Sequence, residues 1–133
     1  MCITYGGLPE EYTRYDSSEI VVIPVPYDRT STWIKGANKG PHALIEASVN
    51  MELYDIETET EVYKKGIHTM KPIETNEDPE ILAELVKDKV KDCLEYKKFP
   101  VIIGGEHSVS IGAFQAFSDI FKNFTILQLD AHA

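Results

Sequence analysis

The stretch that decides the fold is Phe99-Pro100-Val101-Ile102-Ile103-Gly104-Gly105-Glu106-His107-Ser108, an apolar run that leads into a glycine turn. A second apolar run, Phe124–Leu129, leads into Asp130-Ala131-His132-Ala133. Apolar residues recur at helical spacing between the two runs, so the sequence predicts a strand–helix–strand unit. Such a crossover returns the chain parallel in one sheet and brings the carboxyl ends of both strands to one edge. Open α/β sheets bind their ligands at that edge.

Three potential metal ligands follow these two strands. His107 leaves the first strand, and Asp130 and His132 leave the second with a spacing that points both side chains the same way in an extended chain. Carboxylate oxygen favours Mn or Mg, and imidazole nitrogen favours Zn, Fe, Ni or Mn, so the set suits a borderline divalent metal. No cysteine lies near them, which argues against a closed structural zinc site. The sequence therefore predicts an open, catalytic type of metal site at these three residues.

Each motif taken alone also has a less specific interpretation. An Asp-x-His sequence at a strand end is more often a satisfied polar cluster, and a Gly-Gly turn often serves the backbone only. The turn before a helix can also hold a phosphate, although the charge of Glu106 opposes an anion there. The two motifs together favour the metal site over an unrelated, flavodoxin-like binder of an anionic ligand.

The rest of the chain supports one α/β architecture. A strand is predicted at Ile20–Ile23, ended by Pro24, and another at Ile67–Ile73. Helices are predicted from Gly40-Pro41 to about Asn50, and from an Asp78 cap through Lys97. This alternation predicts a doubly wound parallel sheet. We expect residues 1–133 to form a single, partial domain, with residues 1–18 as a surface arm.

Other polar and aromatic residues are predicted to have structural roles. Asp28 is expected to stabilise a turn, Trp33 to be buried, and His42 and His68 to be surface or packed histidines rather than ligands. The phenylalanine stripe of the last helix, at positions 114, 117 and 121, is predicted to lie in the core.

Composition narrows the classes of partner. The chain has 13 basic and 22 acidic residues and a net charge of −9, so it would repel a phosphate backbone, and no nucleic-acid partner is expected. No apolar run approaches the length that spans a bilayer, so no membrane association is expected. Two cysteines without a pairing pattern and the lack of a signal-peptide pattern predict a cytoplasmic protein.

At the two ligand motifs the chain resembles the ureohydrolases, the arginase/agmatinase family. Gly104–Ser108 and Asp130–Ala133 are similar to the family's pair of metal-binding motifs. The segment Pro24–Asp28, followed by Gly36-Ala37 and Gly40-Pro41, resembles its N-terminal signature. Glu in the glycine turn is more similar to agmatinases than to arginases, while Ile45 departs from the Arg that many members carry. The resemblance runs from about Ile20 to the end and implies an arginase-like fold.

What the resemblance implies is an enzyme that hydrolyses a small cationic guanidino compound, agmatine first, to putrescine and urea. It implies two Mn²⁺ ions with a bridging hydroxide. His107 would bind one ion, Asp130 would bridge both, and His132 would bind the other. Guanidinobutyrate, arginine or a formimidoyl compound would suit the same chemistry.

The resemblance also implies that the site is incomplete in these 133 residues. The family's other metal carboxylates, one of them directly after the position of Ala133, and its proton-shuttling histidine come later, so the chain resembles the N-terminal half of an agmatinase-like protein. We therefore expect this chain alone to bind metal weakly, to be inactive, and to form a homo-oligomer or require its other half. The alternative is a non-catalytic interaction module that retains part of the metal site.

Overall fold

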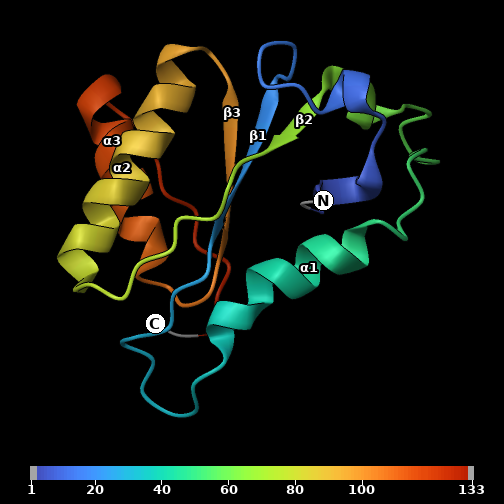
Figure 1. Cartoon of the computed structure of the whole chain (residues 1–133). Helices are drawn as coiled ribbons and strands as arrows, with labels where there is room; N and C mark the ends of the chain where they lie inside the picture. Colours follow the sequence, from blue (N-terminus) through green and yellow to red (C-terminus); the bar gives the residue numbers. More distant parts are fainter. Residues whose placement is uncertain (1–2, 132–133) are drawn as a thin grey trace.

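A parallel sheet of three strands forms the centre of the computed structural model, which describes residues 3–131 (Figure 1). The strands are β1 (Ile20–Val25), β2 (Ile67–Thr69) and β3 (Phe99–Gly104), in the order β2-β1-β3. The central strand, β1, pairs along its whole length with β3 and over its first half with β2. The carboxyl ends of β1 and β3 therefore lie side by side at one edge of the sheet.

Helices lie on both sides of this sheet (Figure 1). The α-helices are α1 (Gly40–Ser48), α2 (Pro79–Glu95) and α3 (Val109–Ile120), and the short 3₁₀ helices are η1 (Tyr5–Gly7), η2 (Glu10–Tyr12), η3 (Ala37–Lys39) and η4 (Val62–Lys65). The pair α2 and α3 covers one face, and α1 lies across the other. This arrangement confirms the predicted class, an α/β sheet wound on both faces. None of the helices within residues 3–131 is long and apolar enough to cross a bilayer.

The core lies between β1 and the α2/α3 pair. Val21, Ile23 and Val25 point into it from the sheet, where they meet apolar side chains of both helices. The helical members are Leu82, Val86, Val90, Cys93, Val109, Ala113 and Ala116. The intervening residues of β1, Val22 and Pro24, are buried on the opposite face. Burial on both faces explains why β1 is apolar throughout rather than alternating.

Small residues set the approach of α3 to α2. A Cβ added at Gly112 would lie 2.2 Å from the carbonyl oxygen of Ala83, so the two backbones nearly touch there. The buried side chains nearby are small. Phe117 packs against the core as a partly buried ring, but Phe114 and Phe121 were placed there wrongly, since they are 41% and 44% exposed. A close helix crossing leaves no space for rings at its centre, so they lie at its margin.

An ion pair also connects the two helices and gives a pH prediction. Lys87 Nζ lies 2.8 Å from Asp119 Oδ2. Its hydrogen bond lowers the pKa of Asp119 and raises the pKa of Lys87. The stabilisation should therefore be complete between the ordinary pKa values, about 4 and about 10. It should be lost as the pH falls through the lowered pKa of Asp119 or rises through the raised pKa of Lys87.

We expect Asp119→Asn to lower the melting temperature slightly at pH 7 and to have little effect in acid below the lowered pKa of Asp119, where the carboxyl group is protonated. Thermal unfolding followed by circular dichroism at both pH values measures this. Lys89→Ala is the control, because its contact with Asp92 lies within α2 alone. An equal effect of Asp119→Asn at both pH values would contradict the linkage.

Three predicted boundaries differ from the structure, the first of them because of backbone hydrogen bonding. Pro24 does not end β1, which continues to Val25. Pro24 faces the side of β2, where β2 has already ended, so its missing N–H removes no ladder bond, while its carbonyl still accepts from Ile73 N at 2.9 Å. The strand β2 stops at Thr69 rather than Ile73, and α2 ends two residues before Lys97.

The predicted final strand is the main error in the fold. Residues 124–129 form no strand pairing in the structure and are exposed, with Leu127 and Leu129 at 81% and 90%. A buried parallel strand requires apolar cover on both faces, and these side chains lack such cover within residues 3–131. The segment nevertheless returns from α3 past β3 to the edge where β1 and β3 end, as the crossover predicted (Figure 1).

Candidate metal centre

The turn after β3 approaches the backbone after β1 so closely that only glycine fits. A Cβ at Gly105 would lie 2.1 Å from the carbonyl oxygen of Tyr27, and one at Gly104 would lie 2.3 Å from a methyl group of Val109. Gly105 N donates to Val25 O at 3.1 Å, and Glu106 N donates to Tyr27 O at 2.9 Å. These contacts hold the turn at the carboxyl edge of the sheet and place His107 directly after it.

His107 and Asp130 come together at this edge, although the strand predicted before Asp130 is not formed. His107 Nδ1 lies 3.4 Å from Asp130 Oδ2. The imidazole side chain is 77% exposed, whereas the carboxylate side chain is only 16% exposed. Two ligands at about 2.1 Å from one ion lie about 3 Å apart when they meet at a right angle. The distance therefore fits two ligands of one divalent cation. That His107 and Asp130 bind such an ion remains a prediction.

A cavity of about 600 Å³ opens beside this pair. The glycine turn and the first residues of α3 form one wall, and residues 126–130 form the other. The cavity holds apolar carbon from Val109 and Phe114 together with the polar groups of Glu106, His107 and Asp130. A small organic cation with an aliphatic stem would find both kinds of surface here.

The third predicted ligand, His132, lies outside the described residues. Within residues 3–131, no group of three His, Cys, Asp or Glu side chains is placed to hold an ion. The histidines predicted not to be ligands lie elsewhere. His42 is exposed on α1, 3.7 Å from Glu46, and His68 Nδ1 is 2.8 Å from the carbonyl oxygen of Thr13.

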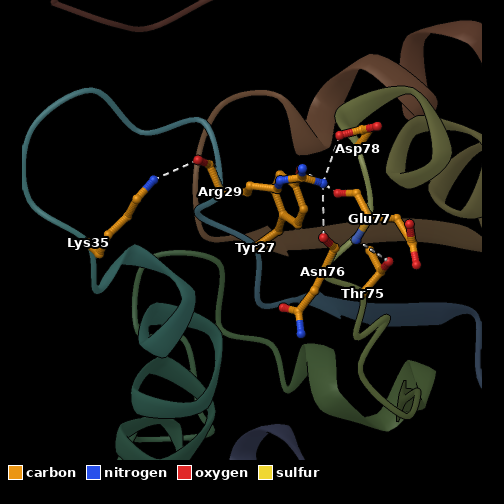
Figure 2. Close-up of polar contacts among 7 residues, drawn as sticks. All are labelled: Tyr27, Arg29, Lys35, Thr75, Asn76, Glu77 and Asp78. Carbon is orange, nitrogen blue, oxygen red and sulfur yellow. Dashed lines mark hydrogen bonds and ion pairs between the residues drawn. The ribbon is translucent and has the colours of Figure 1, made fainter.

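The loop after β1 is held by its own side chains. Lys35 Nζ donates to the carbonyl oxygen of Arg29 at 2.7 Å (Figure 2) and to that of Asp28 at 2.6 Å. Gly36 N donates to Asp28 Oδ2 at 2.6 Å, which confirms the turn-stabilising role predicted for Asp28. The loop therefore has a defined shape although it contains no regular secondary structure.

Arg29 fixes this loop to the segment that leads into α2. Arg29 Nη1 lies 2.8 Å from Asp78 Oδ1 and donates to Asn76 O at 3.0 Å (Figure 2). Tyr27 Oη donates to Glu77 O at 2.9 Å in the same segment. Asp78 occupies the N-cap position of α2, as predicted, but its carboxylate pairs with Arg29 instead of making a capping hydrogen bond. Sequence reasoning missed Arg29, because its partners lie 47 or more positions away.

Glu106 connects the same loop to the glycine turn. Its carboxylate accepts hydrogen bonds from Thr30 N at 2.9 Å, from the Thr30 hydroxyl, and from Ser108 Oγ at 2.6 Å. Partial burial acts to raise the pKa of Glu106, but the hydrogen bonds from Ser108 and Thr30 outweigh it and hold this pKa below its ordinary value. Glu106 is thus an acceptor of hydrogen bonds between two loops of the site.

Trp33 was wrongly predicted to be buried. It lies at the tip of the loop and is 89% exposed, next to Ile34, which is 74% exposed. The bonds of Lys35 and Asp28 turn the loop outward at this point, so both side chains extend into solvent.

A parallel sheet wound on both faces, with a histidine and an aspartate meeting at its carboxyl edge, defines an α/β protein with a candidate metal centre. The arginase family model matches residues 18–133. The chain belongs to the arginase family, and its fold is arginase-like.

Individual relatives agree with this assignment. The chain is 36% identical, over 92% of its length, to the N(1)-aminopropylagmatine ureohydrolase of Synechocystis sp., of which it covers 42%. The solved agmatine ureohydrolase of Thermoplasma volcanium matches 78% of this chain at a TM-score of 0.74 and 30% identity, over 36% of its own chain. The formiminoglutamase of Trypanosoma cruzi, crystallised with Mn²⁺, matches 81% at a TM-score of 0.71 and 26% identity, over 38% of its chain. The chain thus spans less than half the length of the relatives that it matches.

Proposed function

We propose that this chain contributes the first metal ligands of a ureohydrolase that acts on a guanidino compound. The observation that carries this proposal is the 3.4 Å approach of His107 Nδ1 to Asp130 Oδ2 beside an open cavity. Two ligand types from chain segments 23 residues apart converge where α/β sheets bind their ligands. Because the chain belongs to the arginase family, we interpret these two residues as metal ligands.

The metal that we propose is manganese, two ions in the complete site. His107 supplies imidazole nitrogen and Asp130 supplies carboxylate oxygen, a donor set that Mn²⁺ accepts. We propose His132 as the next ligand, on the basis of its spacing from Asp130. A bound metal pair lowers the pKa of water, so that hydrolysis can proceed at neutral pH.

The residues of this chain would position the ligands. The close packing of the glycine turn against the backbone after β1 would fix His107 at the sheet edge, and the hydrogen bond from Gln128 Nε2 at 3.0 Å would help to orient the Asp130 carboxylate. The overall reaction adds one water to the guanidinium carbon and breaks its bond to the alkyl nitrogen. Agmatine would yield putrescine and urea.

The substrate that we propose first is agmatine. The T. volcanium neighbour is named for agmatine, and the Synechocystis relative for N(1)-aminopropylagmatine, which carries a longer amine tail. Both are linear cations, and the chain's net charge of −9 favours a cationic substrate.

Metal analysis of the purified chain tests the proposal. We expect saturable but weak Mn²⁺ binding by the chain alone, and urea release from agmatine only when the remaining family ligands are present. An in-frame Asp codon directly after that of Ala133 would identify the longer polypeptide in which to measure turnover, with arginine as the comparison substrate. A chain that binds no Mn²⁺ would contradict the proposal and favour the non-catalytic module.

We also infer that the chain associates with itself. The apolar segment 124–129 and the outer edge of β3 are both uncovered within residues 3–131. Uncovered apolar edges of this kind favour association. Sedimentation velocity of the chain should show a species larger than a monomer, and a monomer at every concentration would contradict this inference.

A further inference from the structure

We propose that Glu106 is a positioning residue, which sets the place of His107 by tying the glycine turn to the loop after β1. This proposal rests on the proposed function only in taking His107 as a metal ligand. Glu106 itself need not touch the metal or the substrate. Its role follows from two hydrogen bonds that join loops separated by 76 positions in the sequence, and from a third within the turn.

The contacts surround His107 on both sides. Glu106, which precedes it, accepts from the backbone N–H and the hydroxyl of Thr30. Ser108, which follows it, donates to the same carboxylate at 2.6 Å. The carbonyl oxygen of His107 accepts from Ser110 Oγ, also at 2.6 Å. The backbone that carries the imidazole is therefore held through Glu106 and Ser110.

The other end of this link is fixed independently. Thr30 lies between Arg29, which is paired with Asp78, and Ser31, whose amide donates to Asp28 O at 3.3 Å (Figure 2 shows the Arg29 contacts). Lys35 holds the same loop through main-chain carbonyl oxygens. The Glu106 carboxylate is thus bound to a loop that other contacts already hold in place. Its bonds to Thr30 can therefore restrain the glycine turn.

The length of the side chain matters more than its charge in this arrangement. Aspartate keeps the charge but is one methylene shorter, so it cannot reach Thr30 from the same backbone position. Glutamine keeps the length: its oxygen can accept from Thr30 N, and its amide can donate to the hydroxyls of Thr30 and Ser108. The proposal therefore predicts that Glu106→Gln retains the link, and that Glu106→Asp and Glu106→Ala lose it.

Amide hydrogen exchange of the metal-free chain tests the link directly. Loss of a hydrogen bond to a charged group should accelerate exchange at the amide that made it by about tenfold or more. We expect this acceleration at Thr30 in Glu106→Asp and Glu106→Ala, with Glu106→Gln close to the unaltered chain. Exchange within α2 should stay the same in all three variants. An unchanged rate at Thr30 in Glu106→Asp would overturn the proposal.

Mn²⁺ affinity of the same variants tests the consequence for the site. Partners that orient a metal ligand typically contribute 10- to 100-fold to affinity. We expect about tenfold weaker binding by Glu106→Asp and Glu106→Ala, and near-normal binding by Glu106→Gln. Glu19→Ala is the charge control, because this exposed residue lies before β1, at the opposite end of the sheet, 3.5 Å from Lys65.

The possible results separate the two proposals. Equal weakening by Glu106→Gln and Glu106→Asp, or by Glu19→Ala, would mean that charge alone matters and would overturn the positioning role. Absence of Mn²⁺ binding by the unaltered chain would contradict the proposed function, while the exchange rate of the Thr30 amide would still decide whether Glu106 holds the turn.

Discussion

Replacing His107 with alanine is expected to weaken Mn²⁺ binding at least about a hundredfold. Loss of a residue that merely orients a ligand costs up to about 100-fold, and loss of the ligand itself should cost no less. The fold should not change, because the side chain is 77% exposed and substitutions at such positions usually alter stability by less than about 0.5 kcal/mol. Measuring free Mn²⁺ by electron paramagnetic resonance during titration gives the affinity, and urea unfolding gives the stability.

His42→Ala is the matched control for this experiment. It removes another exposed histidine that also lies near a carboxylate, Glu46, but on α1. Its effect on Mn²⁺ affinity should be within about twofold, the scatter expected of single contributions. Asp130→Asn should resemble His107→Ala, since an amide oxygen is a far weaker metal ligand than a carboxylate. If His42→Ala and His107→Ala reduced affinity equally, the binding would be nonspecific.

Replacing Gly105 with alanine is expected to destabilise the chain by about 3 kcal/mol, the upper end of what one added methyl group costs in a packed site. Its Cβ would lie 2.1 Å from the carbonyl oxygen and 2.9 Å from the carbonyl carbon of Tyr27. Tyr27 is itself 2% exposed and belongs to the core, so it cannot move aside. Either the turn or the end of β1 must shift, and the hydrogen bond from Gly105 N to Val25 O would be lost.

Gly40→Ala provides the comparison. The nearest atom to its added Cβ is Gly104 O at 3.7 Å, an ordinary contact, and its backbone is already helical. This variant should change the stability by no more than about 1 kcal/mol, because alanine lowers the entropy of the unfolded chain but is disfavoured in a helical conformation directly before Pro41. Urea unfolding of both variants measures the difference. A Gly105→Ala chain as stable as Gly40→Ala would show that the approach of turn and strand is looser than described.

The parts of the fold that sequence could predict are those governed by local periodicity. The apolar runs of β1 and β3 and the helical spacing of α2 need only neighbouring residues to be recognised. The end of β1 was misjudged because the effect of Pro24 depends on where β2 stops, which is a property of another strand. The segment 124–129 has the composition of a strand, yet pairing requires a neighbour and cover that its own residues do not encode.

The candidate site was predictable to the same extent. His107 and Asp130 could be brought together from topology, because parallel strands end at one edge whatever their loops do. The contacts of Glu106 with Thr30 and of Arg29 with Asp78 could not, because no local pattern links residues so far apart in sequence. The exposure of Trp33 was missed for a related reason. Its position depends on the bonds of Lys35 rather than on its own apolar character.

The bonds of Lys35 have a consequence for how this loop can vary. Because Lys35 donates to main-chain oxygens, the shape of the loop depends little on the side chains of the two residues at its tip. Trp33 and Ile34 extend into solvent, so other residues could replace them without a change in the backbone conformation. A library of variants at these two positions would therefore change the side chains that the loop exposes and keep its backbone conformation.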